Sequence, residues 1–451
     1  MFQDREEKAL YLHGTSRINE QGHLEIGGID AVDLVKQFGS PLYVMDEAYI
    51  RNQCRLYVES FRASGLPFQV AYASKAFSTM AMCRLVQEEG LSLDVVSAGE
   101  LYTALKAGFP PEKIHFHGNN KTPDEIELAL DADIGSFVID NFTEITLLDG
   151  IAQQKGKKVN VLIRVTPGIE AHTHEYIQTG QADSKFGFDL ASGQAAEAVR
   201  IVLDKPALNL IGFHCHIGSQ IFDVAGFAAA IQRMGQFMKE IKEQFQYEAR
   251  VFNVGGGFGI RYTSEDQPLP IPAYVESITQ AIKTTFDQFS LAYPEIWVEP
   301  GRSIVGEAGT TLYTVGTIKH IPGVRKYIAV DGGMTDNPRP ALYQARYEAV
   351  LANKAAQAAR EVVSVAGKCC ESGDMLIWDI ALPEVEVGDI LAVFCTGAYN
   401  YSMASNYNRI GRPAVVFVKD GKADLVVERE SLEDLIRLDR IPARMLYSVA
   451  P

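Results

Sequence analysis

Short apolar runs alternate with longer amphipathic segments over most of the chain. Eight runs rich in β-branched and aromatic residues predict strands, at 68–72, 91–96, 114–117, 136–139, 160–165, 210–214, 251–254 and 296–299. Between them, segments such as AGELYTALKAG and TPDEIELALD carry apolar residues three and four positions apart, which predicts helices. Eight strands alternating with helices predict a parallel (β/α)8 barrel over residues 46–308, because such barrels typically span about 250 residues.

The two ends of the chain have a different pattern. Residues 30–38 have helical spacing between a capping aspartate and Gly39, within an otherwise strand-like N-terminal segment. From about Thr310 the runs TLYTVGTI, KYIAVDGG, REVVSVAG, MLIWDI, ILAVFC and AVVFVKDGKADLVVE predict strands, the last with an Asp420-Gly421 hairpin turn. We therefore predict an α/β barrel plus an all-β domain, sandwich-like or barrel-like and mostly antiparallel, formed by 309–451 together with 1–45.

Composition narrows the class of protein. The chain has 451 residues, 47% of them hydrophobic, which is enough for two domains with sizeable cores. Its 42 basic and 57 acidic residues give a net charge of −15, spread along the chain, so nucleic acid is not an expected partner. Six scattered cysteines and a charged N-terminus predict a cytoplasmic protein without a disulfide scaffold. No apolar run reaches the roughly 20 residues of a membrane span.

Polar side chains follow the predicted strands at the points where the strands end. Active sites of (β/α)8 barrels lie at these C-terminal ends. Lys75 ends the apolar run FQVAYASKA, where burial would disfavour the charged ammonium, so we interpret it as a nucleophile. The other residues at such positions are Asp94, Ser97, His117, Asn119, Asn120, Arg164, His216, Ser219, Gly255, Gly256, Gly257, Glu299 and Arg302.

Two motifs leave alternatives open. The glycines of NVGGGFG expose backbone N–H groups that suit a phosphate, yet a tight strand-to-helix turn explains them equally well, and only Ser219 after the preceding strand favours phosphate. His214 and His216 stand at alternate positions, as two metal ligands on one strand face would. No matching acidic cluster accompanies them, and Glu299 in EPGR lies beside an arginine, so we predict no metal site.

The motifs taken together resemble a known family. In order they are YASKAF, DVVSAGEL, HGNNK, HCHIGSQ, GGGFG, EPGR, DGGMTDNPRPALY, CESGD and GAYNYSMASNYN. This set is similar to the diaminopimelate decarboxylase family, pyridoxal-phosphate enzymes of the alanine-racemase-like barrel class, from about residue 10 to the C-terminus. The resemblance implies a barrel with a C-terminal β domain, pyridoxal 5'-phosphate as cofactor, and a homodimer whose active sites are shared across the interface.

The resemblance also implies roles for the residues around the cofactor. Lys75 would hold it as a Schiff base, His216 would stack on its pyridine ring, and Glu299 would accept the ring N–H. A carboxylate beside that nitrogen favours the protonated ring, which withdraws electrons from the reacting centre. The phosphate would be held by Ser219, Gly255, Gly256, Gly257 and Tyr399.

The residues implied to surround the substrate fit a zwitterionic distal group. They are Arg302, Arg339, Tyr343, Glu371 and Tyr399. Diaminopimelate carries an ammonium and a carboxylate at its distal end, and guanidinium groups bind carboxylates bidentately. Any one of the arginines alone is more simply a surface ion-pair partner. The implied reaction is decarboxylation of meso-2,6-diaminopimelate to L-lysine and CO2.

Cys370, in CESGD, corresponds to the cysteine that family members supply from the partner subunit, and it is the candidate proton donor after CO2 leaves.

Two positions depart from the family pattern. Cys369 is an additional thiol beside Cys370, and Phe77 stands where related sequences commonly have asparagine. Four further residues are well placed without an assigned role: Asp94, His117, Arg164 and Lys185.

Three other functions remain alternatives. A related decarboxylase acting on arginine, ornithine or carboxynorspermidine would share the chemistry. A racemase of the same barrel class would return the proton without losing CO2, and the long C-terminal domain with CESGD argues against it. A non-catalytic binding protein would lack the cofactor lysine, whereas Lys75 is present. In the loop 170–188, we interpret His172 and His174 as solvated residues.

Overall fold

The computed structural model describes residues 11–169 and 184–445, so His172 and His174 lie outside the described residues. The chain forms two compact units, each described here by itself. The first contains Glu47–Ala308 and Gly397–Ser402 with the described residues before Thr15, and the second contains Thr15–Asp46, Gly309–Thr396 and the chain from Met403 onward. The functional division into a cofactor domain and a substrate and interface domain stays a prediction.

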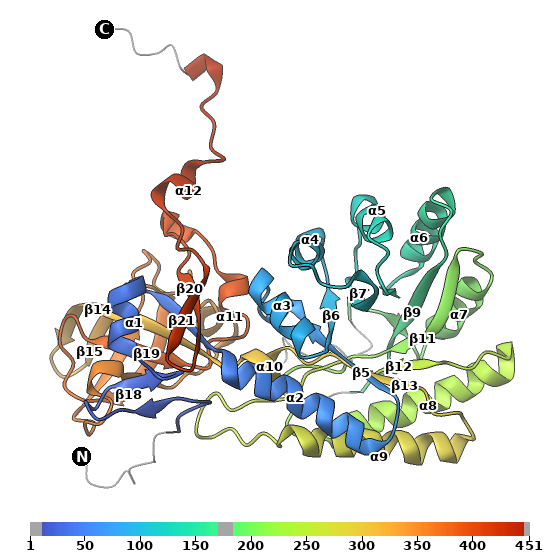
Figure 1. Ribbon diagram of the computed structural model, residues 1–451, viewed down its shortest axis with the longest axis horizontal. Helices are drawn as coiled ribbons and strands as arrows, with labels where there is room; N and C mark the ends of the chain where they lie inside the picture. The colour runs from blue at the N-terminus through green and yellow to red at the C-terminus, as the bar shows by residue number, and fades with distance from the viewer. Residues whose placement is uncertain (1–10, 170–183, 446–451) are drawn as a thin grey trace. The chain divides into compact units, whose positions relative to one another are not determined.

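The first unit is a closed parallel barrel, which confirms the predicted fold class (Figure 1). Every barrel pairing is parallel, β8 pairs with β9, and β13 pairs with β5 to close the ring. Each strand overlaps one of the predicted apolar runs. The barrel strands are β5 (Phe68–Ala73), β6 (Ser92–Val95), β7 (Ile114–Phe116), β8 (Ser136–Ile139), β9 (Val159–Thr166), β11 (Leu208–His214), β12 (Val251–Asn253) and β13 (Glu295–Val298).

Helix caps place the helices directly behind the strand ends. Thr79, Ser97, Thr122 and Asn141 each accept an N–H from the first turn of the helix that follows. Short strand-to-helix turns therefore keep the polar residues at one end of the barrel. The helices of this unit are α2 (Glu47–Ser64), α3 (Met80–Glu88), α4 (Ala98–Lys106), α5 (Pro123–Asp131), α6 (Phe142–Gln154), α7 (Gln194–Leu203), α8 (Ala225–Phe245), α9 (Ile271–Phe289) and α10 (Arg302–Val305).

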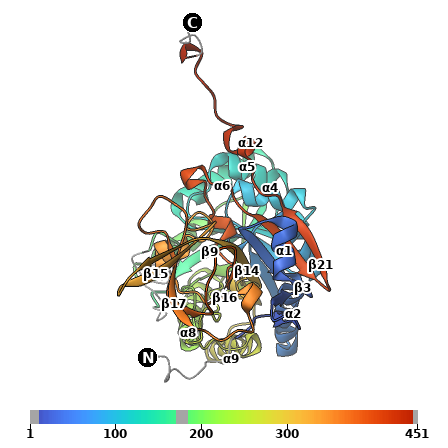
Figure 2. The ribbon, with the colours of Figure 1, turned by 90° about the vertical axis from the view of Figure 1, so that its left-hand side faces the viewer.

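Apolar side chains from neighbouring strands form the core of the barrel. One buried cluster consists of Val138, Leu162, Ile211, Val251 and Trp297, which come from five different strands. The long helices α8 and α9 lie side by side on the outside (Figure 2). Because the apolar runs are buried on both faces, they are continuous in sequence rather than alternating.

The second unit is the predicted β domain. Its main sheet has the order β18-β17-β15-β14-β4-β20-β21, and its pairings are antiparallel except β15–β17 and β20–β4. β4 (Leu42–Asp46) lies between β14 and β20, so the N-terminal segment joins this sheet as expected. A separate small sheet contains β1 (Arg17–Ile18), β2 (Leu24–Ile26) and β3 (Ile29–Asp30). The other strands are β14 (Gly309–Ile321), β15 (Arg325–Val330), β16 (Ala349–Leu351), β17 (Glu361–Ala366), β18 (Met375–Leu382), β19 (Ile390–Phe394), β20 (Ala414–Lys419) and β21 (Lys422–Val427).

Local signals in this unit behave as the sequence predicts. Asp30 caps α1 (Ala31–Phe38) by accepting the N–H of Val32 at 2.8 Å, and Gly39 ends it with φ 73°. Asp420 and Gly421 both have positive φ in the β20–β21 hairpin, as a type I′ turn requires. Among the residues that the structure describes, no helix combines the length and apolar character needed to cross a membrane.

Candidate active site

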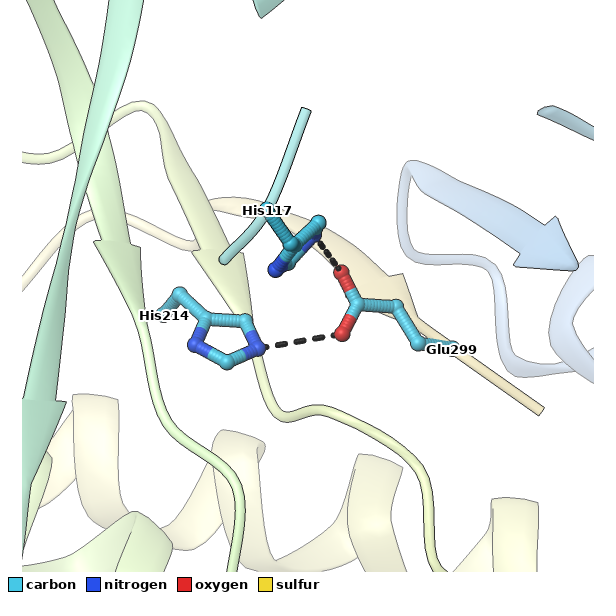
Figure 3. A group of neighbouring side chains, drawn as sticks. All are labelled: His117, His214 and Glu299. Atoms are coloured by element: carbon cyan, nitrogen blue, oxygen red, sulfur yellow. Dashed lines mark hydrogen bonds and ion pairs between the residues drawn. The ribbon is translucent and has the colours of Figure 1, made fainter. Parts of the chain in front are cut away.

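Glu299, which follows β13, is the centre of a buried polar cluster at the strand ends (Figure 3). Its Oε1 lies 2.7 Å from Nε2 of His117 and accepts a hydrogen bond from Nδ2 of Asn253 at 2.6 Å. Its Oε2 lies 3.0 Å from Nε2 of His214. The four side chains come from the ends of four strands, so barrel closure is what brings them together.

These partners keep Glu299 ionised in a buried site. Burial opposes ionisation, but the charge of His117 and the hydrogen bonds of His117 and His214 hold the pKa of Glu299 well below its usual range. Burial also opposes the cationic form of His117, yet Asp94, with Oδ1 at 3.8 Å, and Glu299 raise the pKa of that imidazole. Burial lowers the pKa of His214 to about 4, so this imidazole is neutral.

Two imidazoles and a carboxylate are also a donor set that a divalent metal can use. The sequence argument discounted Glu299 because an arginine follows in EPGR, whereas the structure places this carboxylate beside both imidazoles. However, the nitrogens of His117 and His214 lie against opposite oxygens of one carboxylate. The positive charge of the buried Arg164 guanidinium acts on both imidazoles and opposes the addition of further positive charge there. The arrangement is that of a buried ion-pair cluster.

Glycines 255–257 follow β12 and lie against the backbone of two neighbouring loops. A Cβ on Gly256 would lie 2.1 Å from the carbonyl oxygen of Glu299. A Cβ on Gly257 would lie 2.2 Å from the carbonyl oxygen of Gly218, and φ of Gly257 is 99°. Close approach of the backbones therefore requires glycine here, whatever the loop binds.

Two N–H groups of this glycine loop already have partners within the barrel. The N–H of Gly255 donates to Oδ1 of Asn253 at 2.9 Å. The N–H of Gly256 donates to Nδ1 of His216 at 3.3 Å. An anion at this loop would therefore depend strongly on neighbouring side chains.

Arg302, the first residue of α10, supplies a buried positive charge next to the glycine loop. Its Nη2 donates to Oγ of Ser219 at 3.0 Å, and its Nη1 donates to the hydroxyl of Tyr262. The guanidinium carbon lies 4.8 Å from the ring centre of Tyr399. Nε of Arg302 is buried and has no hydrogen-bond partner among the described residues. The structure thus brings together Arg302, Ser219 and Tyr399.

Lys75 lies in a 3-10 turn, η1 (Ser74–Ala76), directly after β5. Its side chain is exposed, whereas Ser74 and Ala76 are buried. The expectation that the apolar run buries the ammonium is wrong, because the turn directs this one side chain outward. Tyr399, with φ 62°, donates its N–H to the carbonyl of Ala76 at 2.8 Å, so the 397–402 segment lies beside the lysine turn.

Phe77, the departure from the family pattern beside Lys75, is a core residue. It is 1% exposed, its ring centre lies 5.7 Å from that of Tyr401, and its carbonyl accepts a hydrogen bond from Tyr72. The substituted side chain therefore packs inward, while Lys75 is exposed.

Two residues without an assigned role, Arg164 and Lys185, flank one aromatic ring. The guanidinium carbon of Arg164 lies 4.4 Å from the ring centre of Phe186, and Nζ of Lys185 lies 5.0 Å from it. Arg164 Nη1 is also 3.7 Å from Oδ1 of Asp140. Asp94 is buried, which raises its pKa to about 6.

The second unit carries the remaining predicted substrate residues. Arg339 begins α11 (Arg339–Tyr343), is 8% exposed, and donates Nη1 to the hydroxyl of Tyr347 at 2.7 Å. Tyr343 ends the helix and is half-buried. An arginine held this way presents its charge from a fixed position.

The two adjacent cysteines between β17 and β18 differ in exposure. Cys369 is buried, which raises its pKa to about 11, while Cys370 and Glu371 are exposed. The N–H of Cys370 donates to Oδ1 of Asn408 at 2.7 Å, which fixes the backbone at the exposed thiol. Of the two thiols, only Cys370 is presented to a reactant.

Sequence reasoning missed Asn253, Tyr262 and Asp374. Asn253 is the last residue of the seventh barrel strand and Tyr262 lies in the segment that follows it, so their place at a strand end was an available signal. The carboxylate of Asp374 accepts the N–H of Met334 at 2.6 Å and that of Cys369 at 2.8 Å, tying the loop before Arg339 to the cysteine loop. Its signal was the aspartate that closes CESGD.

The chain is similar to characterised decarboxylases. Residues 47–306 match the family described as "Pyridoxal-dependent decarboxylase, pyridoxal binding domain". Diaminopimelate decarboxylase of Bacillus subtilis (strain 168) is 60% identical over 430 residues, covering 95% of this chain and 98% of that protein. The enzyme of that name from Staphylococcus aureus (strain COL) is 51% identical, covering 94% and 99%.

Solved structures agree with this similarity. Diaminopimelate decarboxylase from M. jannaschii in complex with L-lysine is 38% identical, with a TM-score of 0.90 over 96% of this chain and 100% of that one. A lysine/ornithine decarboxylase from Vibrio vulnificus, 23% identical with a TM-score of 0.73 over 86% and 97%, shares the fold.

Proposed function

Because the chain belongs to the pyridoxal-dependent decarboxylases, and among them to the diaminopimelate decarboxylase family, we infer that it is a carboxy-lyase of lysine biosynthesis. It converts meso-2,6-diaminopimelate to L-lysine and CO2. The observation that carries this conclusion is 60% identity over nearly the whole length of an enzyme of that name.

The barrel unit suits pyridoxal 5'-phosphate. It offers an exposed lysine amine at a strand end, a buried ionised carboxylate, and a basic side chain at a glycine loop. Two buried nitrogens, Nε of Arg302 and Nδ1 of His214, have no hydrogen-bond partner among the described residues, as expected where a polar group is to be received. When bound, the cofactor supplies a protonated ring that accepts the electron pair left by the departing carboxylate.

Three residues serve the reactive part of the cofactor. Lys75 binds it covalently through its amine, and its exposed position supports this role. Glu299 accepts the ring N–H, which its low pKa supports. His216 stacks on the ring as a neutral imidazole, because burial and the charge of Lys75 hold its pKa well below its usual range.

The phosphate is bound by Ser219, Tyr399 and glycines 255–257. The contacts of Arg302 with Ser219 and with the ring of Tyr399 support a place for this guanidinium near the phosphate as well as the substrate. Since two of the glycine N–H groups have protein partners, the side chains carry more of the phosphate binding than the sequence suggested.

The substrate is bound by Arg302, Arg339, Tyr343, Glu371 and Tyr399, and Cys370 returns a proton after CO2 leaves. Exposure of Cys370 and Glu371 supports their acting on substrate held by a second subunit of a homodimer. All six cysteines lie among the described residues and none forms a disulfide, which supports residence in the reducing cytoplasm.

A panel of amino acids tests the substrate. The purified protein with pyridoxal phosphate should release CO2 and L-lysine from meso-diaminopimelate, with chiral analysis of the product. Release of CO2 from ornithine, arginine or carboxynorspermidine, with none from diaminopimelate, would contradict the substrate assignment and leave the reaction type standing.

Mixing two inactive variants tests the shared site. Lys75→Ala and Cys370→Ala each remove one side of it, so subunit exchange should restore about a quarter of wild-type activity through the heterodimers. If no activity returns although mass spectrometry detects heterodimers, the shared site is wrong. Two copies of Lys75→Ala serve as the control.

A further inference from the structure

The two imidazoles beside Glu299 are not equivalent. Nε2 of His117 lies 2.7 Å from one oxygen of Glu299 and 3.8 Å from the carboxylate of Asp94. Nε2 of His214 lies 3.0 Å from the other oxygen, and its Nδ1 has no partner among the described residues. His117 therefore lies between two carboxylates, whereas His214 touches one.

Charge follows from this geometry. Burial opposes the cationic form of His117, but the two carboxylates that flank it raise its pKa and favour that form, while burial lowers the pKa of His214 to about 4 and leaves it neutral. Burial raises the pKa of Asp94 to about 6, so this carboxyl is mainly ionised above that pH. Two anions and one cation give the group Asp94, His117 and Glu299 a net charge of about −1.

We propose that His117 is a positioning residue, a fixed cation between Asp94 and Glu299 that keeps Glu299 ionised while the trio retains one negative charge for the protonated pyridine nitrogen. The proposal rests on the proposed function. Without His117, two buried carboxylates would face each other, and their repulsion would favour a shared proton. Glu299 would then be a poor acceptor for the ring N–H.

The surrounding groups do not replace this cation. Besides Asp94 and Glu299, the charged or titratable groups acting on His117 are Arg164 of β9, His214 of β11, His115 of β7 and Glu100 of α4. Arg164 lies 3.7 Å from Asp140, and burial lowers the pKa of His115 to about 3. Burial raises the pKa of Glu100 to about 7, so variants are compared at matched pH.

Ring protonation can be measured directly on protein loaded with pyridoxal phosphate carrying ¹⁵N in the ring, by the ¹⁵N chemical shift. We expect the wild type and His214→Gln to hold a protonated ring at neutral pH. His117→Gln should lower the midpoint of ring protonation by about one pH unit or more, that is, about tenfold in the protonation constant. His214→Gln is the matched control because it removes a contact with the same carboxylate without removing a charge.

A second substitution separates charge from structure. Asp94→Asn leaves only the carboxylate of Glu299 to face two cations, His117 and the protonated pyridine ring. This substitution should therefore also lower the pH midpoint of ring protonation. The double variant with Asp94→Asn and His117→Gln again has one carboxylate facing the ring, so its midpoint should return toward that of the wild type. If His117 only filled space, the additional change Asp94→Asn would not restore the midpoint of ring protonation that His117→Gln had lowered.

Two results would overturn the inference: an unchanged midpoint in His117→Gln, or a double variant no better than either single one. If His117→Gln yields no folded protein, Asp94→Asn decides, because an unchanged midpoint there contradicts the charge balance. A wild type that binds no pyridoxal phosphate, or releases no CO2 from diaminopimelate, would contradict the proposed function instead.

Discussion

Substitution of Gly256 by alanine should disturb both the glycine loop and the carboxylate that faces the cofactor. The added Cβ would lie 2.1 Å from the carbonyl oxygen of Glu299 and 2.9 Å from its carbonyl carbon. Both atoms are backbone, so they cannot move aside as a flexible side chain would. The same strand end is tied to the loop by the hydrogen bond from the N–H of Glu299 to the carbonyl of Gly255 at 2.9 Å.

The size of the effect follows from these contacts. Overpacking a well-filled interior costs about 1–3 kcal/mol, and loss of the hydrogen bond between the loops adds about 1 kcal/mol. We expect destabilisation by about 2–4 kcal/mol. Displacement of Glu299 by about 1 Å should weaken cofactor function by up to about 100-fold.

Gly150 provides the matched control. It lies within α6 with no atom within 4 Å of an added Cβ, and alanine there should stabilise the helix by about 0.5–1 kcal/mol. Thermal unfolding of the protein without cofactor and absorbance titration with pyridoxal phosphate measure both variants. If Gly256→Ala unfolds and binds like the wild type, the close approach of the loops is refuted. Equal damage in Gly150→Ala would refute the explanation by local contact.

Three further predictions concern single side chains. Lys75→Ala should lose covalently held cofactor, seen in its absorbance after dialysis, and at least about 10³-fold of CO2 release; retention of the full wild-type absorbance would exclude Lys75 as the attachment site. Arg339→Lys should raise KM for diaminopimelate about 10–100-fold because a bidentate contact is lost, whereas Arg325→Lys should leave KM unchanged; equal effects would argue against a substrate role. Burial raises the pKa of Asp336 to about 7, so the folded protein keeps this carboxyl proton up to a higher pH than the unfolded chain does. The free energy of unfolding therefore falls as pH rises from about 4 to about 7. Asp336→Asn should flatten this fall in urea unfolding, and an unchanged slope would contradict it.

The fold was accessible from sequence because burial and secondary structure reinforce each other in a parallel barrel. Each strand is a short continuous apolar run, and capping residues such as Ser97 and Asn141 mark the helix starts. β16 was missed because three residues, AVL, carry no period that distinguishes a strand. Its pairing with β19 depends on contacts distant in sequence.

The site was accessible only in part. The rule that active sites lie at strand ends selected Glu299, His117 and Asp94, but no local pattern reveals that His117 and Glu299, distant in sequence, meet at 2.7 Å. Lys75 shows the opposite failure. Its neighbours predicted burial, whereas one 3-10 turn exposes it. The backbone conformation of two or three residues decides whether such a side chain is buried or exposed, and the spacing of apolar residues along the sequence does not reveal that conformation.

The proposed function assigns different tasks to the two units. In that proposal, Glu299 helps to stabilise the electrons released by the departing carboxylate, and its partners His117, His214 and Asn253 all lie with it in the barrel unit. The same proposal assigns the choice of a substrate with a charged distal end to Arg339, at the start of α11, and to Glu371, and Asp374 joins these two segments of the second unit. On this proposal, a decarboxylase of this fold can change its substrate by altering those segments while the barrel cluster stays intact. Substitutions of Arg339 should change KM between substrates, whereas substitutions of His117 should lower activity toward all of them alike.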